Sequence, residues 1–173
     1  MIVGSRDFRD EEYEEPRKEF EAAGYEVVTV SSIVGRVRGV LGTWVAVDRA
    51  LAGCRASEFD GVVFVGGYGA LEYEDNRSAH RLCCQALAGG KVLAALCVAP
   101  IILARAGVLN MRRATSFPDQ REAMEACGAV HTGDAVTVDG LIVTGDGPMH
   151  TRQFARAVLK ALESRTDVLN QAT

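Results

Sequence analysis

One cysteine stands where its thiol could act as a nucleophile. In residues 91–107, KVLAALCVAPIILARAG, a buried strand runs directly into Cys97 and an apolar helix follows, with Pro100 near its start. A side chain at such a strand–turn–helix junction lies at the carboxyl end of the sheet, where open α/β folds bind ligands. The helix N-terminus favours a thiolate, so we expect a lowered thiol pKa. The alternative is a small core residue. For the other cysteines, Cys54, Cys83, Cys84 and Cys127, we expect a place in the core or no role in the chemistry.

A glycine-rich turn provides a second candidate feature. Residues 63–76, VFVGGYGALEYEDN, place Gly66-Gly67-Tyr68-Gly69 directly after a strand. In a parallel sheet this loop lies beside the Cys97 turn, so the amides of Gly67 and Val98 could form an oxyanion hole. Taken alone, the glycines could equally make only a tight turn. They match neither a phosphate-binding loop nor a dinucleotide fingerprint, so no cofactor is expected.

Carboxylates and histidines are the remaining candidates for catalytic residues. The acidic run of residues 10–15 precedes or begins the first helix, where carboxylates are favourable, and composition alone selects none of them. His150 follows a glycine-rich loop that contains Asp146, whereas His80 and His131 are most simply surface residues. His150 could also be an ordinary surface residue. No cysteine or histidine spacing fits a metal site, so no metal is expected.

These residues are set in an alternating β-α-β pattern. Short Val-rich segments at 25–30, 61–65, 91–96 and 141–144 predict buried parallel strands, and segments 14–23, 76–88, 101–106, 119–127 and 151–163 predict helices. Gly24, Gly107 and Gly128 follow helical segments as expected for C-caps. The pattern predicts an α/β fold, a three-layer α/β/α sandwich with a mostly parallel central sheet.

Two segments depart from this alternation. Residues 35–51 predict a small antiparallel excursion, and residues 136–144 predict a hairpin around Asp139-Gly140. The opening strand, residues 1–4, is short for a central strand, which leaves open a start upstream of Met1. We expect a single domain over residues 1–166 and a frayed polar tail over residues 167–173.

Composition narrows the functional classes. The 173 residues are 48% hydrophobic and carry a net charge of −4. A globular chain without a strong cationic field is a poor partner for nucleic acid or for an anionic membrane surface. No apolar run approaches the length of a membrane span, and the odd number of cysteines without a secretory signal favours a reduced, cytoplasmic protein.

Five segments in order resemble the PfpI/DJ-1 superfamily of intracellular protease, Parkinson-protein and glyoxalase III-like proteins. They are FRDEEYEEPRKEFEAAGYEV (8–27), FDGVVFVGGYGALEY (59–73), GKVLAALCVAPIILARAGVL (90–109), RRATSF (112–117) and VDGLIVTGDGP (138–148). The resemblance implies a flavodoxin-like fold, a homodimer or higher homo-oligomer, and Cys97 as the nucleophile of a strand–helix elbow.

The resemblance also selects one carboxylate. A glutamate four residues before a proline hydrogen-bonds the cysteine in the family, and Glu12 stands four residues before Pro16. Protease-like members follow the nucleophile with a histidine, whereas this chain has Val98, and the Parkinson-protein branch has a histidine where this chain has Phe117. Neither base is present, which argues against general protease activity because an amine leaving group needs an acid.

Two hypotheses for the function are favoured over a third, that the site is vestigial and the protein is a structural oligomer. The first is a cysteine-dependent enzyme acting on a small carbonyl or amide compound, with Cys97 attacking carbon and Glu12 moving a proton. Tyr68, Glu72, Asp146 and His150 are further candidates for its pocket. The second is an oxidative-stress sensor or protective protein, in which the same thiol is oxidised to a sulfinic acid stabilised by Glu12.

Overall fold

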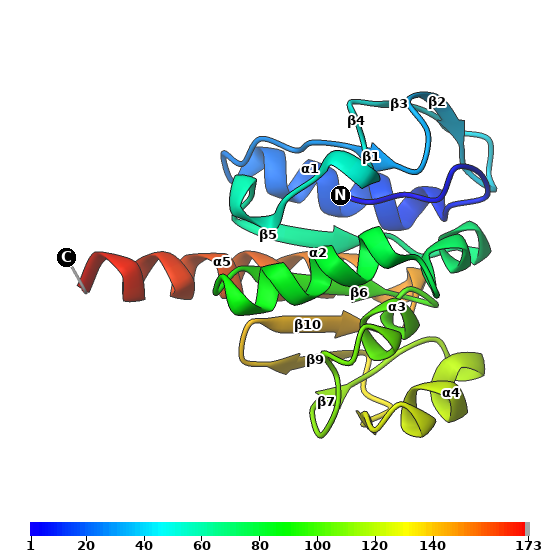
Figure 1. The fold of residues 1–173 in the computed structure, drawn as a ribbon. Helices are drawn as coiled ribbons and strands as arrows, with labels where there is room; N and C mark the ends of the chain where they lie inside the picture. Colours follow the sequence, from blue (N-terminus) through cyan, green and yellow to red (C-terminus); the bar gives the residue numbers. More distant parts are fainter. Residues whose placement is uncertain (172–173) are drawn as a thin grey trace.

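A central sheet organises the computed structural model, which describes residues 1–171 (Figure 1). Its middle has the order β5-β6-β10-β9, formed by β5 (Gly61–Phe64), β6 (Val92–Leu96), β10 (Ile142–Gly145) and β9 (Val136–Asp139). β5, β6 and β10 are parallel, and β9 is antiparallel to β10. Ile2 bridges β5 to the short parallel pair β1 (Val30–Ser31) and β4 (Arg49–Ala50). The predicted mostly parallel sheet is confirmed.

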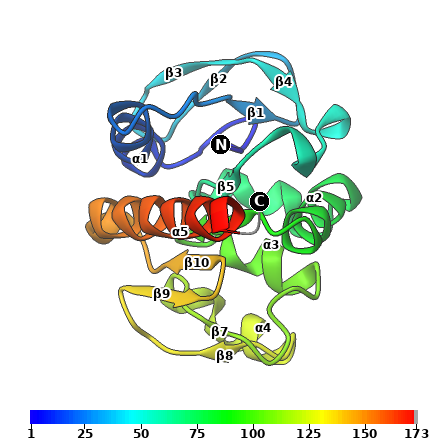
Figure 2. The same ribbon diagram turned by 90° about the vertical axis from the view of Figure 1, so that its left-hand side faces the viewer.

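Helices cover both faces of this sheet. Figure 2 shows α1 (Asp10–Ala22) and α5 (Thr151–Gln171) on one face, and α2 (Arg77–Ala88) and α3 (Pro100–Arg105) on the other. Every residue of β6 is buried, as expected for a strand between two helical layers. Phe154 and Val158, one turn apart on α5, pack into the same core. The three-layer α/β/α sandwich predicted from the sequence is therefore confirmed.

Smaller elements complete the chain at the edges of the sheet. These are β2 (Gly35–Arg38), β3 (Trp44–Val47), β7 (Arg113–Ala114), α4 (Arg121–Ala126) and β8 (Val130–His131). Short 3-10 helices lie at Leu51–Gly53, Ala56–Glu58, Tyr68–Tyr73, Pro118–Gln120 and Pro148–His150. β2 and β3 pair antiparallel, which confirms the predicted excursion. The predicted hairpin is also confirmed, because β9 and β10 meet at Gly140, whose φ is 62°.

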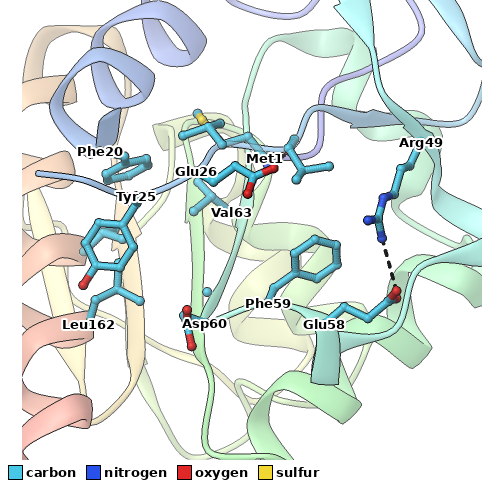
Figure 3. Close-up of a pocket in the computed structure, with 14 residues that line it drawn as sticks. Met1, Phe20, Tyr25, Glu26, Arg49, Glu58, Phe59, Asp60, Val63 and Leu162 are labelled. Atoms are coloured by element: carbon cyan, nitrogen blue, oxygen red, sulfur yellow. Dashed lines mark hydrogen bonds and ion pairs between the residues drawn. The ribbon is translucent and has the colours of Figure 1, made fainter. Parts of the chain in front are cut away.

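Several predicted boundaries were wrong. The strand predicted at residues 25–30 is reduced to β1, because residues 25–28 line a cavity of about 280 Å³ instead of pairing with a neighbouring strand (Figure 3). α1 begins at Asp10, before the expected residue 14. The segment predicted at 119–127 starts as a 3-10 turn. α5 continues to Gln171, into the expected tail, and residues 172–173 lie outside the described part.

Among residues 1–171, no helix is both long and apolar enough to cross a membrane.

Candidate active site

Cys97 occupies a strained position between β6 and α3. Its φ is 62°, in the left-handed region that residues with a side chain rarely adopt. Two main-chain hydrogen bonds hold this conformation: the Cys97 N–H donates to Gly145 O at 3.0 Å, and the Phe117 N–H donates to Cys97 O at 2.8 Å. The predicted strand–helix elbow is confirmed, and three separate chain segments position the thiol.

The glycine turn after β5 brings backbone close to the sulfur. The N–H groups of Gly67 and Val98 both face the thiol and favour its ionised form. Gly67 has a φ of 87°, and a Cβ there would lie 2.5 Å from Arg9 N. At Gly66 a Cβ would overlap Glu12 Oε2 and would lie 2.5 Å from Cys97 Cβ. Only glycine therefore allows the Glu12 carboxyl and the cysteine to approach each other.

Glu12 projects from the first turn of α1 into this buried corner. Its residue is 1% exposed, and both carboxyl oxygens lack a well-formed hydrogen bond although the Cys97 thiol and the Gly66 N–H face them. Burial raises the pKa of Glu12 to about 8, so the carboxyl is protonated at neutral pH. Pro16 has no N–H to donate to the Glu12 carbonyl, which loosens the helix at Glu12.

The expected low pKa of the thiol was wrong. Burial and, after it, the nearby Glu12 charge raise the pKa of Cys97 to about 12, and the two N–H groups offset this only in part. Cys97 is 8% exposed, and α3 has only six residues, so the field at its N-terminus is weak compared with desolvation. While Glu12 is protonated, its charge no longer opposes ionisation of the thiol.

Tyr68 is an aromatic residue of the site. It follows Gly67, and the negative charge of Cys97 contributes to raising its pKa after the larger effect of Asp119. Its hydroxyl donates to Asp119 Oδ2 at 2.8 Å. Glu72 is the last residue but one of the 3-10 stretch Tyr68–Tyr73 and points elsewhere: its carboxylate accepts hydrogen bonds from Ser5 and Ser32.

His150 and Asp146 form a pair of their own. Asp146 Oδ1 lies 2.8 Å from His150 Nδ1, and both side chains are partly exposed. His150 lines a cavity of about 670 Å³ together with Glu15, Arg152 and Arg156, and Cys97 is not part of its lining. The structure therefore brings Cys97, Glu12, Gly67, Val98 and Tyr68 together, and places Glu72 and the pair of Asp146 and His150 apart from them.

Three contributors to the site escaped the sequence analysis. The sequence analysis treated Gly66 only as part of a turn. In the structure Gly66 lies between the buried Glu12 carboxyl and Cys97, where a side chain has no room. Phe117 contributes its N–H, which no side-chain pattern reveals. Asp119 meets Tyr68 across 51 positions of sequence and carries no local signal. Within residues 1–171, no group of three or more His, Cys, Asp or Glu side chains could hold a metal ion.

Most of the chain is similar to proteins of one known family. The model of the DJ-1/PfpI family matches residues 1–161. The chain belongs to the DJ-1/PfpI family. A deglycase of Pyrococcus abyssi is 31% identical and is matched over 94% of this chain and 98% of its own length. An uncharacterized protein of Methanocaldococcus jannaschii is 35% identical, over 96% of this chain and 83% of its own length.

Structures of the DJ-1/PfpI family show the same fold. The crystal structure of a ThiJ/PfpI domain protein from Brachyspira murdochii is 33% identical, with a TM-score of 0.92 and 94% coverage of each chain. Schizosaccharomyces pombe DJ-1 has a TM-score of 0.82 at 16% identity, over 97% of each chain, a likeness of fold alone. The flavodoxin-like fold implied by the resemblance is thus confirmed.

Proposed function

We propose that this protein is an enzyme whose Cys97 thiol adds to the carbonyl carbon of a small reactive carbonyl compound. The observation that carries the proposal is the convergence on one sulfur of the Glu12 carboxyl and the N–H groups of Gly67 and Val98. A deglycase name among the relatives supports the same class of activity. Cofactor and metal are not required for such an addition.

The proposed first step needs only these groups. When Glu12 is ionised, it accepts the thiol proton as the sulfur attacks the carbonyl carbon. The C–S bond forms, the C=O π bond breaks, and the oxyanion accepts hydrogen bonds from the Gly67 and Val98 amides until Glu12 returns the proton to it. The product is a hemithioacetal, in which all atoms of the aldehyde and the thiol are retained.

A 2-oxoaldehyde could proceed from that adduct to a 2-hydroxy acid. The ionised Glu12 removes the proton from the sulfur-bearing carbon and delivers it to the neighbouring carbon. The hydroxyl proton on the sulfur-bearing carbon passes to the neighbouring carbonyl oxygen, so that the hydroxyl carbon becomes the carbonyl of a thioester of Cys97 and the former carbonyl carbon becomes an alcohol. Water then hydrolyses the thioester, which releases the acid and restores the thiol. Amide hydrolysis is less well served, because Val98 offers no proton for an amine leaving group.

The test follows turnover of methylglyoxal by the wild type, Cys97→Ser and Glu12→Gln, with Cys84→Ser as the matched control at an exposed cysteine. We expect loss of methylglyoxal and appearance of lactate with the wild type and the control only. Turnover that persists in Cys97→Ser would disprove the proposal. Small amides are assayed beside methylglyoxal to decide between the two substrate classes.

Oxidation of Cys97 by peroxide is a second candidate function. A relative of 31% identity, covering 90% of this chain and 92% of its own length, is named general stress protein 18 of Bacillus subtilis. Two molecules of hydrogen peroxide would convert the thiol to a sulfinic acid and two of water, and the protonated Glu12 would donate to a sulfinate oxygen. Rapid oxidation confined to Cys97, without turnover of any carbonyl compound, would favour this function.

We also propose that the protein forms a homodimer or higher homo-oligomer. Large apolar side chains are exposed on and around the β2–β3 hairpin: Ile33, Val34, Val40, Leu41 and Trp44. Such patches are typical of protein interfaces. Arg36 and Arg38 lie over the Trp44 ring and flank this apolar patch with charge, and a second copy of this chain is the occupant that we propose for it. Light scattering should show dissociation of Leu41→Glu but not of Met149→Glu, a control at another exposed apolar residue.

A reducing, cytoplasmic setting and a small-molecule substrate complete the proposal. All five cysteines are free thiols, which supports a reducing compartment. The net charge of −4 supports neither a nucleic acid nor an anionic membrane as a partner. Fractionation of cells that express the chain tests the compartment.

A further inference from the structure

The hydrogen bond between Tyr68 and Asp119 joins the two chain segments that flank Cys97. On one side, Tyr68 directly follows Gly67, whose N–H faces the sulfur. On the other side, Asp119 follows Phe117 by two residues, and the Phe117 N–H donates to Cys97 O at 2.8 Å. The Tyr68 hydroxyl closes this circuit by donating to Asp119 Oδ2 at 2.8 Å. The nucleophile is thus encircled by a continuous chain of contacts.

This bond is exposed at the surface, whereas the thiol is buried. Tyr68 is 65% exposed and Cys97 is 8% exposed. Tyr68 is nevertheless close enough to the sulfur for the charge of Cys97 to affect its titration. The Tyr68 ring and its bond to Asp119 are therefore exposed groups that the structure places near the buried thiol.

The backbones on which the two side chains stand have little freedom to separate. A Cβ at Gly69 would overlap Arg6 O, and one at Gly67 would lie within 2.6 Å of Asp7 O, so this turn is pressed against the backbone of residues 6–9. On the opposite side Pro118 restricts the turn that carries Asp119. Opening of the entrance must therefore occur by rotation of the Tyr68 side chain, which breaks its hydrogen bond.

We propose that the Tyr68–Asp119 hydrogen bond is a clasp across the entrance to Cys97, and that these two residues determine specificity by admitting small carbonyl compounds and excluding bulky ones. The choice of a carbonyl substrate rests on the proposed function. Size selection at the thiol does not depend on turnover, because any electrophile that reacts with Cys97 has to pass the same entrance.

The experiment measures alkylation of Cys97 by a small and a bulky reagent, iodoacetamide and N-pyrenylmaleimide, with peptide mass spectrometry to separate Cys97 from the exposed Cys84. The reactions are run at pH 9 because the thiol is buried. Tyr68→Phe keeps the ring and removes the donor. Asp119→Ala removes the acceptor, and Asp119→Asn keeps an acceptor oxygen without the charge. Tyr25→Phe is the matched control at a tyrosine of the cavity at the amino end of the sheet.

In the wild type, iodoacetamide should label Cys97 and the bulky maleimide should label it far more slowly. Tyr68→Phe and Asp119→Ala should each raise the maleimide rate about fivefold relative to the iodoacetamide rate, as expected for loss of one hydrogen bond. Asp119→Asn should change this ratio less, and Tyr25→Phe should leave it unchanged. Equal ratios in all variants, or a wild-type thiol that iodoacetamide does not reach, would overturn the clasp.

The outcomes separate the clasp from the proposed function. If the alkylation ratios change as expected but no variant turns over methylglyoxal, the entrance is gated and the proposed reaction is wrong. If turnover depends on Cys97 but the ratios do not change, the reaction stands and the clasp is wrong. If the alkylation ratios change as expected and turnover depends on Cys97, Tyr68→Phe should improve kcat/KM for phenylglyoxal relative to methylglyoxal.

Discussion

Replacement of Gly66 by alanine should damage both the fold and the reactivity of the thiol. The added methyl group would overlap Glu12 Oε2 and lie 2.5 Å from Cys97 Cβ and 2.6 Å from Leu96 O, whereas ordinary contacts are 3.4–4 Å. Relief of these overlaps requires a displacement of about 1 Å. The Leu96 carbonyl belongs to the buried strand β6 and cannot yield, so the displacement falls on Glu12 and Cys97.

The size of the two effects follows from that displacement. Overpacking of a closely packed site costs about 1–3 kcal/mol in the free energy of unfolding. A misplacement of about 1 Å at a reacting group reduces a rate by roughly 100-fold. We therefore expect Gly66→Ala to unfold at lower urea concentration and to lose nearly all turnover of methylglyoxal that depends on Cys97.

The assay compares Gly66→Ala with Gly53→Ala. A Cβ at Gly53 meets nothing within 4 Å, so this control introduces the same methyl group without overlap and should change the free energy of unfolding by less than about 0.5 kcal/mol. Urea unfolding gives the stability of each variant, and the rate of Cys97 alkylation reports the position of the thiol. If the two variants matched in stability and in alkylation rate, Gly66 would not be the point of closest approach that the structure describes.

Three further outcomes are expected. Burial raises the pKa of Glu12 from 4.5 to about 8, so the folded state holds this proton more tightly than the unfolded state does. The resulting stabilisation is full below pH 4.5 and is lost as the pH rises to 8. Over that range the free energy of unfolding of the wild type should fall by roughly 5 kcal/mol relative to that of Glu12→Gln, as measured by urea unfolding. The Asp10 carboxylate accepts hydrogen bonds from Leu41 N and Thr43 N at 2.7 and 2.8 Å, and Asp10→Ala should lower the free energy of unfolding by about 2–3 kcal/mol. Casein hydrolysis should be weak or absent in the wild type; robust hydrolysis abolished by Cys97→Ser would reveal an acid that the site described here lacks.

Local patterns predicted most of the framework. The alternation of Val-rich strands and amphipathic helices predicted the layered fold, and the Asp139-Gly140 pair predicted the hairpin of β9 and β10. The junction of a buried strand and a helix marked Cys97, because an abrupt turn after a buried strand places one side chain at the carboxyl edge of the sheet. These signals lie within a few residues of the features they predict, so local sequence patterns are sufficient to predict those features.

Features that depend on distant partners could not be predicted in this way. The pKa of Cys97 is set by burial under other segments, which overcame the expected effect of the short helix α3. The strand predicted at residues 25–30 lacks a neighbour along most of its length, and strand propensity cannot replace the missing partner. Glu12 was distinguished from its acidic neighbours only by resemblance, because each of them suits a helix N-terminus equally well.

The groups that fix the sulfur in place are main-chain groups, and this has a consequence for directed evolution. The amides of Gly67, Val98 and Phe117 and the carbonyl of Gly145 keep their positions whatever side chain residue 117 carries. Phe117 is 37% exposed and Tyr68 is 65% exposed, so both side chains can be exchanged without opening the core. A library randomised at these two positions should therefore change which compounds react while each member retains the same nucleophile geometry.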